Sequence, residues 1–410
     1  MTLDLPTRRF QSLLTAWSDF LPYHQTDWNE RRKGPDACDF ITGDPQDGPI
    51  PGFVEALQRA AVPQRPDWFG YLHDIPEAVE AVAASLRDWS GVPFEPEDIA
   101  LTNGGFGALA ASIRAATDPD DEIIVNPPLW FAYEGICVDA GVTPVKVSIN
   151  RETFDLNLDA IAAAITPKTR AVLVNSPHNP TGKVYPPETL ERLAHLLDEA
   201  SARHGRAIYI ISDEAFRQLV FNGERSYSPA EFYDRTFVCY TYGKVLLAPG
   251  ERLGYVAIPP TMAEREQMRL ALLAIRASSG YLVPNTTLQY ALPELNRMSI
   301  DIDHLQRKRD RLIDELRAIG FEVHRPESSL FLIPKSPLED EWAFCRLLAD
   351  HHDVYTMPGS LFSLPGYFRL SLTATDEMIE LAIPRFRAAF EQAQNEQSTM
   401  RLREAAVTDD

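Results

Sequence analysis

Short apolar runs recur through the middle of the chain, and helical patterns separate most of them. The runs lie at residues 99–101, 122–125, 171–174, 207–211, 237–240 and 254–258. The helical patterns between them cover residues 106–116, 158–165 and 187–204. Such alternation is typical of buried strands in a mostly parallel sheet whose two faces are covered by helices. The sequence therefore predicts an α/β fold, and sheets of this kind bind ligands at the carboxyl ends of their strands.

The two ends of the chain have a different rhythm. Residues 1–37 are polar and rich in aromatic residues, with a helix expected around residues 8–21. A long helical pattern at 300–319, with Ser299 as its expected N-cap and Gly320 as its stop, precedes short strands and further helices. The expected boundaries are 1–45 and 290–395 for a smaller α+β domain, 46–289 for a large domain and 396–410 for a flexible tail.

Charge and composition exclude several classes of protein. The 410 residues carry a formal net charge of −20, which argues against a general binder of nucleic-acid phosphates. No apolar run approaches the roughly 20 residues that a membrane span needs. The first residues lack the basic-then-apolar pattern of a signal peptide, and the four cysteines have no metal-ligand spacing. We therefore expect a cytoplasmic protein with reduced thiols and without a metal, membrane or nucleic-acid partner.

A lysine on a glycine-flanked turn follows the apolar run at 237–240. Lys244 can act as a covalent catalyst if its amine is held against a carbonyl group, and pyridoxal phosphate is the usual carbonyl compound. Arg252, eight positions later, and Thr241 suit the phosphate of the same cofactor. This stretch alone is equally compatible with a surface lysine and arginine on a glycine-rich loop.

Glycines also follow the expected strand at 99–101. Gly104, Gly105 and Phe106 lie where a helix begins, so their backbone N–H groups can point at an anion and the helix dipole favours it. They are candidates for a phosphate cup. The alternative is a tight turn between a strand and a helix.

Three further candidates each follow an expected strand. Trp130 could stack on a flat heteroaromatic ring, or could simply close the core. Asn179 has prolines on both sides that fix its backbone, so its amide could donate to a phenolate oxygen, or the loop could be only a rigid turn. Asp213 is a carboxylate at a buried strand end and needs a partner there, which a protonated pyridine nitrogen would supply. The alternative is that Asp213 caps the N-terminus of a helix.

Two residues outside the alternating core are candidates for substrate binding. Arg369 is a charge within an apolar strand pattern, where a substrate carboxylate or an internal salt bridge would pair with it. Gly43 follows a short apolar piece and, taken alone, serves a turn.

Together these stretches resemble the class I/II aminotransferases of fold type I, the aspartate-aminotransferase-like pyridoxal phosphate enzymes. The resemblance covers about residues 40–390, with all motifs in family order. It implies that Lys244 forms a Schiff base with the cofactor and then moves protons. It also implies that Asp213 keeps the pyridine nitrogen protonated, that Asn179 donates to the ring hydroxyl oxygen and that Trp130 stacks on the ring. The phosphate would be held by Gly105, Phe106, Thr241 and Arg252.

The resemblance further implies an amino acid and a 2-keto acid as substrates. Arg369 would clamp the substrate carboxylate, and Gly43 would close over it. The site would be completed across a homodimer, with Tyr71 reaching the phosphate of the partner subunit.

The sequence departs from the family pattern at two positions. Phe216 stands where a tyrosine is usual, so the pKa of the Schiff base is expected to be raised unless Tyr133 or Tyr242 supplies a substitute donor. Gly243 stands where a serine is common, which removes one hydrogen bond on the phosphate side.

Other functions remain open at this point. Phe216 keeps elimination, cyclisation or oxygen-dependent oxidation of an amino acid as alternatives to transamination. A ligand-sensing regulator would need a DNA-binding module, for which about 40 residues before Phe40 leave little room. The sequence has no unambiguous second arginine for a dicarboxylic substrate. Arg276 near the domain junction is a candidate, but its position favours a solvated helix arginine.

Overall fold

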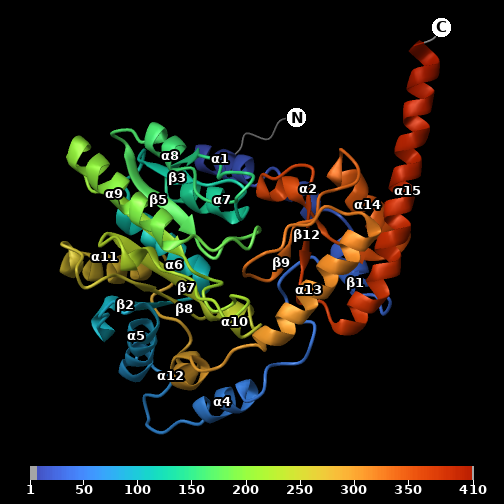
Figure 1. The fold of residues 1–410 in the computed structure, drawn as a ribbon. Coiled ribbons are helices and arrows are strands. Elements are labelled where there is room, and N and C mark those ends of the chain that lie inside the picture. Colours follow the sequence, from blue (N-terminus) through green and yellow to red (C-terminus); the bar gives the residue numbers. More distant parts are fainter. Residues whose placement is uncertain (1–6, 409–410) are drawn as a thin grey trace.

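The computed structural model describes residues 7–408, with side chains described for residues 7–398. Figure 1 shows helices around a central sheet in the large domain, and a smaller domain in which β1 lies among the C-terminal strands and helices. The expected α/β fold is therefore confirmed. Residues 1–6 of the expected N-terminal segment and residues 409–410 of the expected tail lie outside the described residues.

The central sheet has seven strands in the order β2-β8-β7-β6-β5-β3-β4. Their bounds are β2 Ile99–Thr102, β3 Glu122–Val125, β4 Thr143–Lys146, β5 Thr169–Asn175, β6 Tyr209–Asp213, β7 Thr236–Thr241 and β8 Gly254–Ala257. β8 is antiparallel to β2 and β7, and the other neighbouring pairs are parallel. Every expected apolar run forms a strand. The strand that the sequence did not single out, β4, lies at the sheet edge, where Pro144 and its missing N–H are tolerated.

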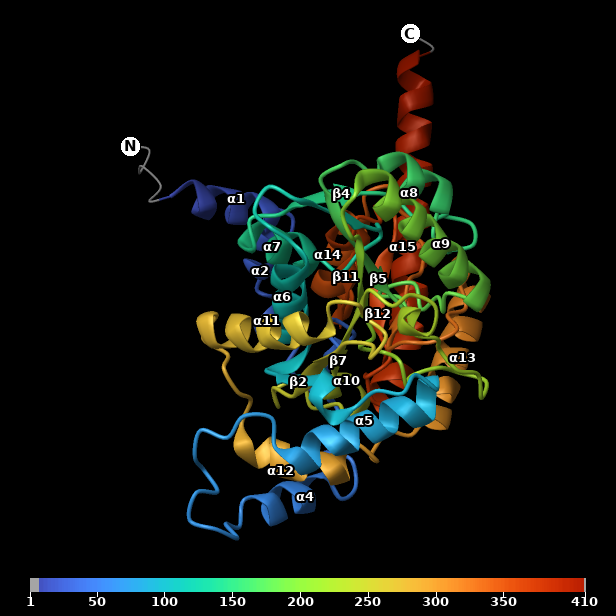
Figure 2. The same ribbon diagram turned by 90° about the vertical axis from the view of Figure 1, so that its left-hand side faces the viewer.

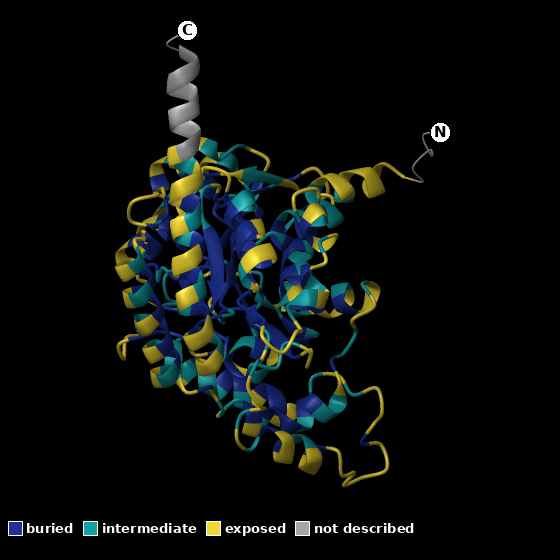
Figure 3. Ribbon diagram, turned by 90° about the vertical axis from the view of Figure 1, so that its right-hand side faces the viewer, coloured by how far each residue is buried: buried dark blue, intermediate teal, exposed yellow. Residues whose placement is uncertain are grey.

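Helices cover both faces of this sheet. The helices of the large domain are α4 Phe53–Ala60, α5 Pro76–Ser90, α6 Gly104–Ala116, α7 Ala132–Asp139, α8 Leu158–Ala164, α9 Pro187–His204, α10 Tyr242–Val245, α11 Arg265–Ser278 and α12 Thr286–Leu295, with 3-10 turns at Pro96–Asp98 and Pro229–Glu231. Strand residues alternate between the faces. Ile123 and Val125 pack into the core with α6 and α7, and Ile124 packs into the core with α8 and α9. Figure 3 shows the buried strands enclosed by helices whose outer faces are exposed.

The smaller domain contains short strands and three long helices. They are β1 Cys38–Asp39, β9 Phe331–Leu332, β10 Val354–Tyr355, β11 Met357–Pro358, β12 Phe368–Ser371, α13 Ile302–Ile319, α14 Glu341–His352 and α15 Asp376–Thr408, with a 3-10 turn at Gly359–Phe362. β1 pairs in parallel with β10, and β12 lies antiparallel between β11 and β9. The expected N-cap of α13 is wrong: the Asp301 carboxylate, not the Ser299 hydroxyl, accepts the backbone N–H of His304. Gly320 does end that helix.

Two further observations concern helices at the chain ends. α15 continues to Thr408, where the sequence favoured a frayed tail (Figure 1). The helix expected around residues 8–21 is divided into α1 Arg8–Ala16 and α2 Phe20–His24, followed by α3 Trp28–Arg31.

Within the described part of the chain, no helix combines the length and the apolar character that crossing a membrane requires.

The N-terminal helices bridge the two domains. α1 packs against α7 of the large domain, and Figure 2 shows the two helices together. Trp17 lies so close to Gly135 that a Cβ atom there would be 2.4 Å from the indole nitrogen. Phe20 stacks on Phe131 with ring centroids 4.5 Å apart. The chain then enters β1 in the smaller domain, so this segment closes over the junction between the domains.

Candidate active site

A cavity of about 460 Å³ lies where the carboxyl ends of β5, β6 and β7 meet the strands of the smaller domain. Its wall includes these residues expected from the sequence: Gly43, Gly105, Phe106, Trp130, Asn179, Asp213, Thr241, Lys244, Arg252 and Arg369. Gly104 does not line the cavity but lies against Arg252. Tyr71 is 90% exposed and lies away from the cavity of its own chain. Motifs from both domains therefore form one composite site.

Lys244 reaches this cavity from α10, directly after β7. The Thr241 hydroxyl accepts the backbone N–H of Gly243 at 3.3 Å and so fixes the turn. A Cβ atom placed on Gly43 would lie 3.5 Å from the Lys244 Nζ atom, so the chain at Gly43 covers the amine. Among the described residues, the amine has no hydrogen-bond or ion-pair partner.

The surroundings of Lys244 disfavour its charged form. Burial lowers the pKa of Lys244 to about 8, and the charge of Arg369 acts in the same direction. The carboxylates of Asp44 and Asp213 act in the opposite direction. A larger share of this amine is therefore uncharged near neutral pH than is usual for lysine, as a nucleophile or base requires.

Asp213 lies at the end of β6. The phenol of Tyr133 donates to its Oδ2 atom at 2.6 Å, and the backbone N–H of Ala215 donates to Oδ1 at 3.1 Å. Burial raises the pKa of Asp213, whereas these two hydrogen bonds and the charge of Lys244 lower it. No cation forms an ion pair with this carboxylate among the described side chains, so it has capacity for a cationic ligand.

Arg252 and the first turn of α6 form one end of the site. Gly104 begins the helix with φ of +73°, and a Cβ atom there would lie 2.6 Å from the Nη2 atom of Arg252. The Arg252 guanidinium donates to the carbonyl oxygens of Pro249 at 2.6 Å and Asn103 at 3.4 Å. A helix N-terminus beside a guanidinium group is suited to bind a phosphate.

Trp130 and Asn179 also lie at the cavity wall. The indole of Trp130 makes edge contacts with Phe106 at 4.6 Å and Tyr133 at 5.4 Å between ring centroids. The backbone N–H of Asn179 donates to the side chain of Asn175 at 2.7 Å, which holds the loop after β5 in place. An aromatic ring and a fixed amide therefore border the space beside Lys244.

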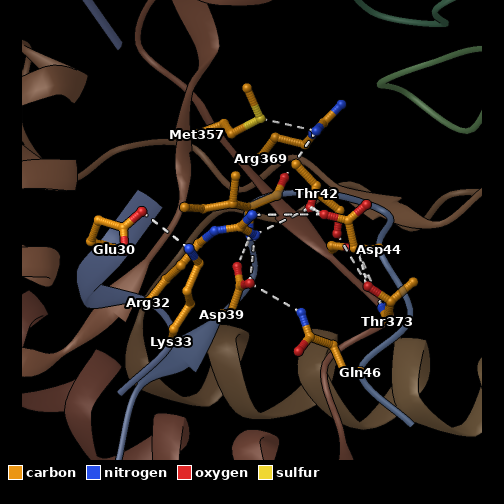
Figure 4. A network of polar contacts seen from close by, with 12 residues as sticks. Glu30, Arg32, Lys33, Asp39, Thr42, Asp44, Gln46, Met357, Arg369 and Thr373 are labelled. Carbon is orange, nitrogen blue, oxygen red and sulfur yellow. Dashed lines mark hydrogen bonds and ion pairs between the residues drawn. The ribbon is translucent and has the colours of Figure 1, made fainter. Parts of the chain in front are cut away.

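Arg369 is a buried guanidinium that lacks a carboxylate partner among the described residues. It donates to the side-chain oxygen of Asn179 at 3.3 Å and to the carbonyl oxygen of Ile41 at 3.0 Å. It also donates to the sulfur of Met357 at 3.0 Å (Figure 4). Its carbon Cζ lies 3.8 Å from the ring centroid of Phe331. Burial lowers the pKa of Arg369 to about 9. The alternative of an internal salt bridge is therefore wrong, and the guanidinium is available for a carboxylate ligand.

A polar network holds the chain around Gly43 against Arg369 (Figure 4). Arg32 donates to Asp39 at 2.7 Å, and the Thr42 hydroxyl donates to Asp44. The carbonyl oxygen of Thr42 accepts from the hydroxyl of Thr373 at 3.2 Å. The loop that covers Lys244 is thus tied both to the N-terminal segment and to the end of β12.

Residues 35–386 match the family described as aminotransferase class I and II. A probable aspartate/prephenate aminotransferase from Thermus aquaticus is 32% identical over 375 residues, which cover 88% of this chain and 93% of that protein. The chain belongs to the class I and II aminotransferases.

Solved structures agree with this assignment. An aminotransferase from Eubacterium rectale is 28% identical, with a TM-score of 0.86 over 96% of this chain and 99% of that one. The aspartate aminotransferase of Thermotoga maritima is 27% identical, with a TM-score of 0.79 over 93% of this chain and 99% of that one.

This aminotransferase depends on pyridoxal 5'-phosphate, and its residues fit that cofactor. Lys244 offers an unpaired amine, and Asp213 is a buried carboxylate without a cationic partner among the described residues. A phosphate suits the start of α6, where Gly104 has no side chain and Arg252 lies alongside. The three sets of contacts lie around one cavity, as the aldehyde, ring nitrogen and phosphate of one small molecule require.

The structure of the aminotransferase also bears on the two departures from the family pattern. The ring centroid of Phe216 lies 6.0 Å from the Lys244 Nζ atom, without a phenol to donate. Neither possible substitute has a free donor: Tyr133 donates to Asp213, and Tyr242 donates to Asn296 at 2.7 Å.

Steric crowding explains why a glycine occupies position 243. A Cβ atom at this position would lie 2.9 Å from the Cα atom of Pro249, which is closer than side chains approach a backbone. The glycine therefore permits a close contact between α10 and the following loop, so the missing serine is a consequence of packing as well as a lost hydrogen bond.

Arg276 differs from the expectation of a solvated residue. It is 3% exposed, pairs with Asp74 at 2.7 Å and donates to the carbonyl oxygen of Leu101 at 2.7 Å. Its charge is therefore used in holding α11 to β2, and it does not line the cavity.

Sequence reasoning missed one part of the aminotransferase site. Phe20, Tyr23, His24 and Asn29 of the N-terminal segment line the cavity. The only signal was the aromatic content of residues 1–37, which does not indicate where such a segment packs.

Proposed function

We propose that this aminotransferase moves the amino group of an L-amino acid to a 2-keto acid, with Lys244 as the residue that binds the cofactor aldehyde. The observation that carries this proposal is the unpaired Lys244 amine in the same cavity as Arg369, a guanidinium with no carboxylate partner among the described residues. One group is suited to covalent and proton chemistry, and the other to holding a carboxylate.

Lys244 is the base of the proposed reaction. Its lowered pKa provides an uncharged amine, so Nζ can take the proton from the α-carbon of a bound amino acid. Pyridoxal phosphate, when bound, supplies a conjugated ring that accepts electron density from that carbon. Asp213 holds a negative charge for the ring nitrogen, and Tyr133 orients this carboxylate through its hydrogen bond.

The remaining predicted residues position the two ligands. Trp130 and Asn179 would border the cofactor ring, and Gly105, Phe106, Thr241 and Arg252 would hold its phosphate. Arg369 would bind the substrate carboxylate, with Gly43 over it. The chain at Gly43 and the N-terminal segment also limit access of water to the site.

The proposed active form is a homodimer with shared sites. Tyr71 is 90% exposed and Phe69 is 60% exposed on the connection between α4 and α5. Such exposed aromatic side chains are expected on a surface that a second copy of the chain covers. In this arrangement Tyr71 donates to the phosphate bound by the partner subunit. We place the protein in the cytoplasm, in keeping with four buried, unpaired cysteines.

A single-turnover spectrum of the holoenzyme tests the proposed reaction. Without a keto acid, an L-amino acid donor should convert the visible absorbance band to a near-ultraviolet band, with one equivalent of keto acid and no oxygen uptake. Release of ammonia or consumption of oxygen would instead indicate elimination or oxidation, which the names of the relatives above do not favour. A protein that stays colourless with added cofactor, or a Lys244→Ala variant that keeps the visible band, would contradict the assignment of Lys244.

A further inference from the structure

The cavity wall near Arg369 is built from aromatic rings. Phe20 stacks on Phe131 with ring centroids 4.5 Å apart and planes inclined by 15°. Phe131 in turn lies 6.1 Å from Phe362, whose ring centroid is 4.3 Å from the guanidinium carbon of Arg369. Phe362 is buried behind the wall, whereas Phe20 and Phe131 line the same cavity as Arg369, so a substrate whose carboxylate binds Arg369 would share the cavity with these two rings.

This wall brings together distant parts of the chain. Phe20 comes from α2 in the N-terminal segment, whereas Phe131 directly precedes α7 and lies next to Trp130 at 5.9 Å. Trp17 makes an edge contact with Phe131 at 5.9 Å and so holds the stacked pair from outside the cavity. Trp17 and Trp130 thus hold Phe131 in place, as a preformed binding surface for another flat or bulky apolar group requires.

The positive charges of the cavity are already assigned to other tasks. Lys244 would bind the cofactor aldehyde, Arg252 is tied to the start of α6, and Arg369 would hold one substrate carboxylate. The remaining basic side chain of the described wall is His24, whose ring lies 6.2 Å from Phe20. A second carboxylate on the substrate would lose its hydration against Phe20 and Phe131 without gaining a guanidinium partner.

We propose that the preferred amino donor is an L-amino acid with a bulky, uncharged aromatic side chain, which packs against the Phe20–Phe131 pair. This inference rests on the proposed aminotransferase function and names its substrate class. It separates this chain from the aspartate aminotransferase of Thermotoga maritima, whose name states an acidic donor. The specificity-determining residue is Phe20, because its ring lines the cavity and stacks on Phe131.

Single-turnover rates on the holoenzyme test the substrate class. We expect L-phenylalanine to react with a kcat/KM about 10- to 200-fold above that of L-alanine, since apolar pocket contacts give discrimination of that order. L-Aspartate should react no faster than L-alanine. A kcat/KM for L-aspartate above that for L-phenylalanine would overturn the inference while leaving transamination intact. If no amino acid reacts, the proposed function itself fails.

Binding without turnover gives a second, independent measurement. Calorimetry on the holoenzyme should show tighter binding of 3-phenylpropionate than of succinate, because both carry a carboxylate for Arg369 and only the first carries a ring. Tighter binding of succinate would show that His24 or a side chain of a second copy accepts the distal carboxylate, and would overturn the inference.

Phe20→Ala separates specificity from general structure. In this variant the ratio of kcat/KM for L-phenylalanine to that for L-alanine should fall about 10-fold or more, because the larger side chain loses more apolar contact with the wall than the methyl group does. Phe10→Ala is the matched control, because Phe10 lies on the same segment, is 40% exposed and does not line the cavity. Equal losses for both amino acids in Phe20→Ala would show a structural role only and would overturn the assignment of Phe20.

Discussion

The phenol of Tyr133 donates to the Oδ2 atom of Asp213 at 2.6 Å, across the space between α7 and the end of β6. This hydrogen bond orients a buried carboxylate and favours its charged form, against a burial that raises the pKa of Asp213. The carboxylate can then carry the negative charge that a protonated pyridine nitrogen requires.

Tyr133→Phe should weaken cofactor binding. Loss of a hydrogen bond to a charged group costs about 1.5–3 kcal/mol, so we expect roughly a 10- to 100-fold higher dissociation constant for pyridoxal phosphate. Fluorescence titration of the apoenzyme measures it. Tyr209→Phe is the control, because Tyr209 begins β6, the strand that Asp213 ends, and does not line the cavity. Equal affinities in Tyr133→Phe and wild type would contradict the role of this bond.

The rate of cofactor attachment should depend on the protonation of Lys244. Since its pKa is lowered to about 8, the uncharged amine accumulates as the pH rises through 8. The rate at which the apoenzyme binds pyridoxal phosphate, followed by stopped-flow absorbance, should therefore increase through that pH and then level off. A midpoint near the ordinary lysine pKa of about 10.4 would contradict this.

Asp44 offers a variant for the same measurement. Its carboxylate favours the charged form of Lys244, so Asp44→Asn should move the midpoint to lower pH. Asp47→Asn is the matched control on the same loop, because Asp47 pairs with Lys308 at 3.5 Å instead. Equal shifts in both variants would indicate a general effect of charge and not the specific contact.

Much of the site was predictable from the ends of strands. Asp213, Thr241 and Asn179 each follow an apolar run, and parallel neighbours in one sheet bring such ends to one edge. Local pattern was sufficient there because each motif lies directly beside the strand that positions it.

Residues that depend on distant packing were not predictable in this way. Phe20 reaches the cavity only because α1 packs on α7, and these two helices are more than one hundred positions apart in the sequence. Arg276 can be buried because its guanidinium pairs with the carboxylate of Asp74, which is 202 positions away in the sequence. Helical periodicity alone cannot distinguish such an arginine from a solvated one.

Gly243→Ser should destabilise the protein in spite of the hydrogen bond that a serine could add. The new Cβ atom would lie 2.9 Å from the Cα atom of Pro249, and overpacking of this kind costs about 1–3 kcal/mol. Denaturant unfolding of the apoenzyme measures the loss. Gly250→Ser on the same loop is the control, because a Cβ atom there would meet no atom within 4 Å. Equal stability of the two variants would contradict the steric explanation.

Phe216→Tyr should lower the pKa of the nitrogen that joins Lys244 to the cofactor. The ring centroid of Phe216 lies 6.0 Å from Nζ, so a phenol at this position would be near the bound cofactor, where it would donate to the ring oxygen and stabilise the deprotonated form. A neutral hydrogen bond of about 1 kcal/mol corresponds to a shift of roughly 0.7 pH units. The pH titration of the visible absorbance band measures it in wild type and variant. Identical titrations would show that the missing phenol has no such effect.

Tyr23→Phe should weaken the binding of every substrate carboxylate. The Tyr23 hydroxyl and the Nε atom of Arg369 are buried without hydrogen-bond partners among the described residues, and both side chains line the cavity. Burial raises the pKa of Tyr23 far above its usual range, so the phenol remains a donor, and a carboxylate at Arg369 would accept from it.

The expected loss is about 1.5–3 kcal/mol, or roughly 10- to 100-fold in the dissociation constant, for 3-phenylpropionate and propionate alike. Phe20→Ala should instead affect only the ligand with a ring, so calorimetry on the two variants assigns the carboxylate end and the side-chain end of the pocket separately. Tyr185→Phe is the control, since its hydroxyl is also buried without a partner among the described residues and does not line the cavity. Unchanged binding of both ligands in Tyr23→Phe would show that Arg369 holds the carboxylate without this phenol.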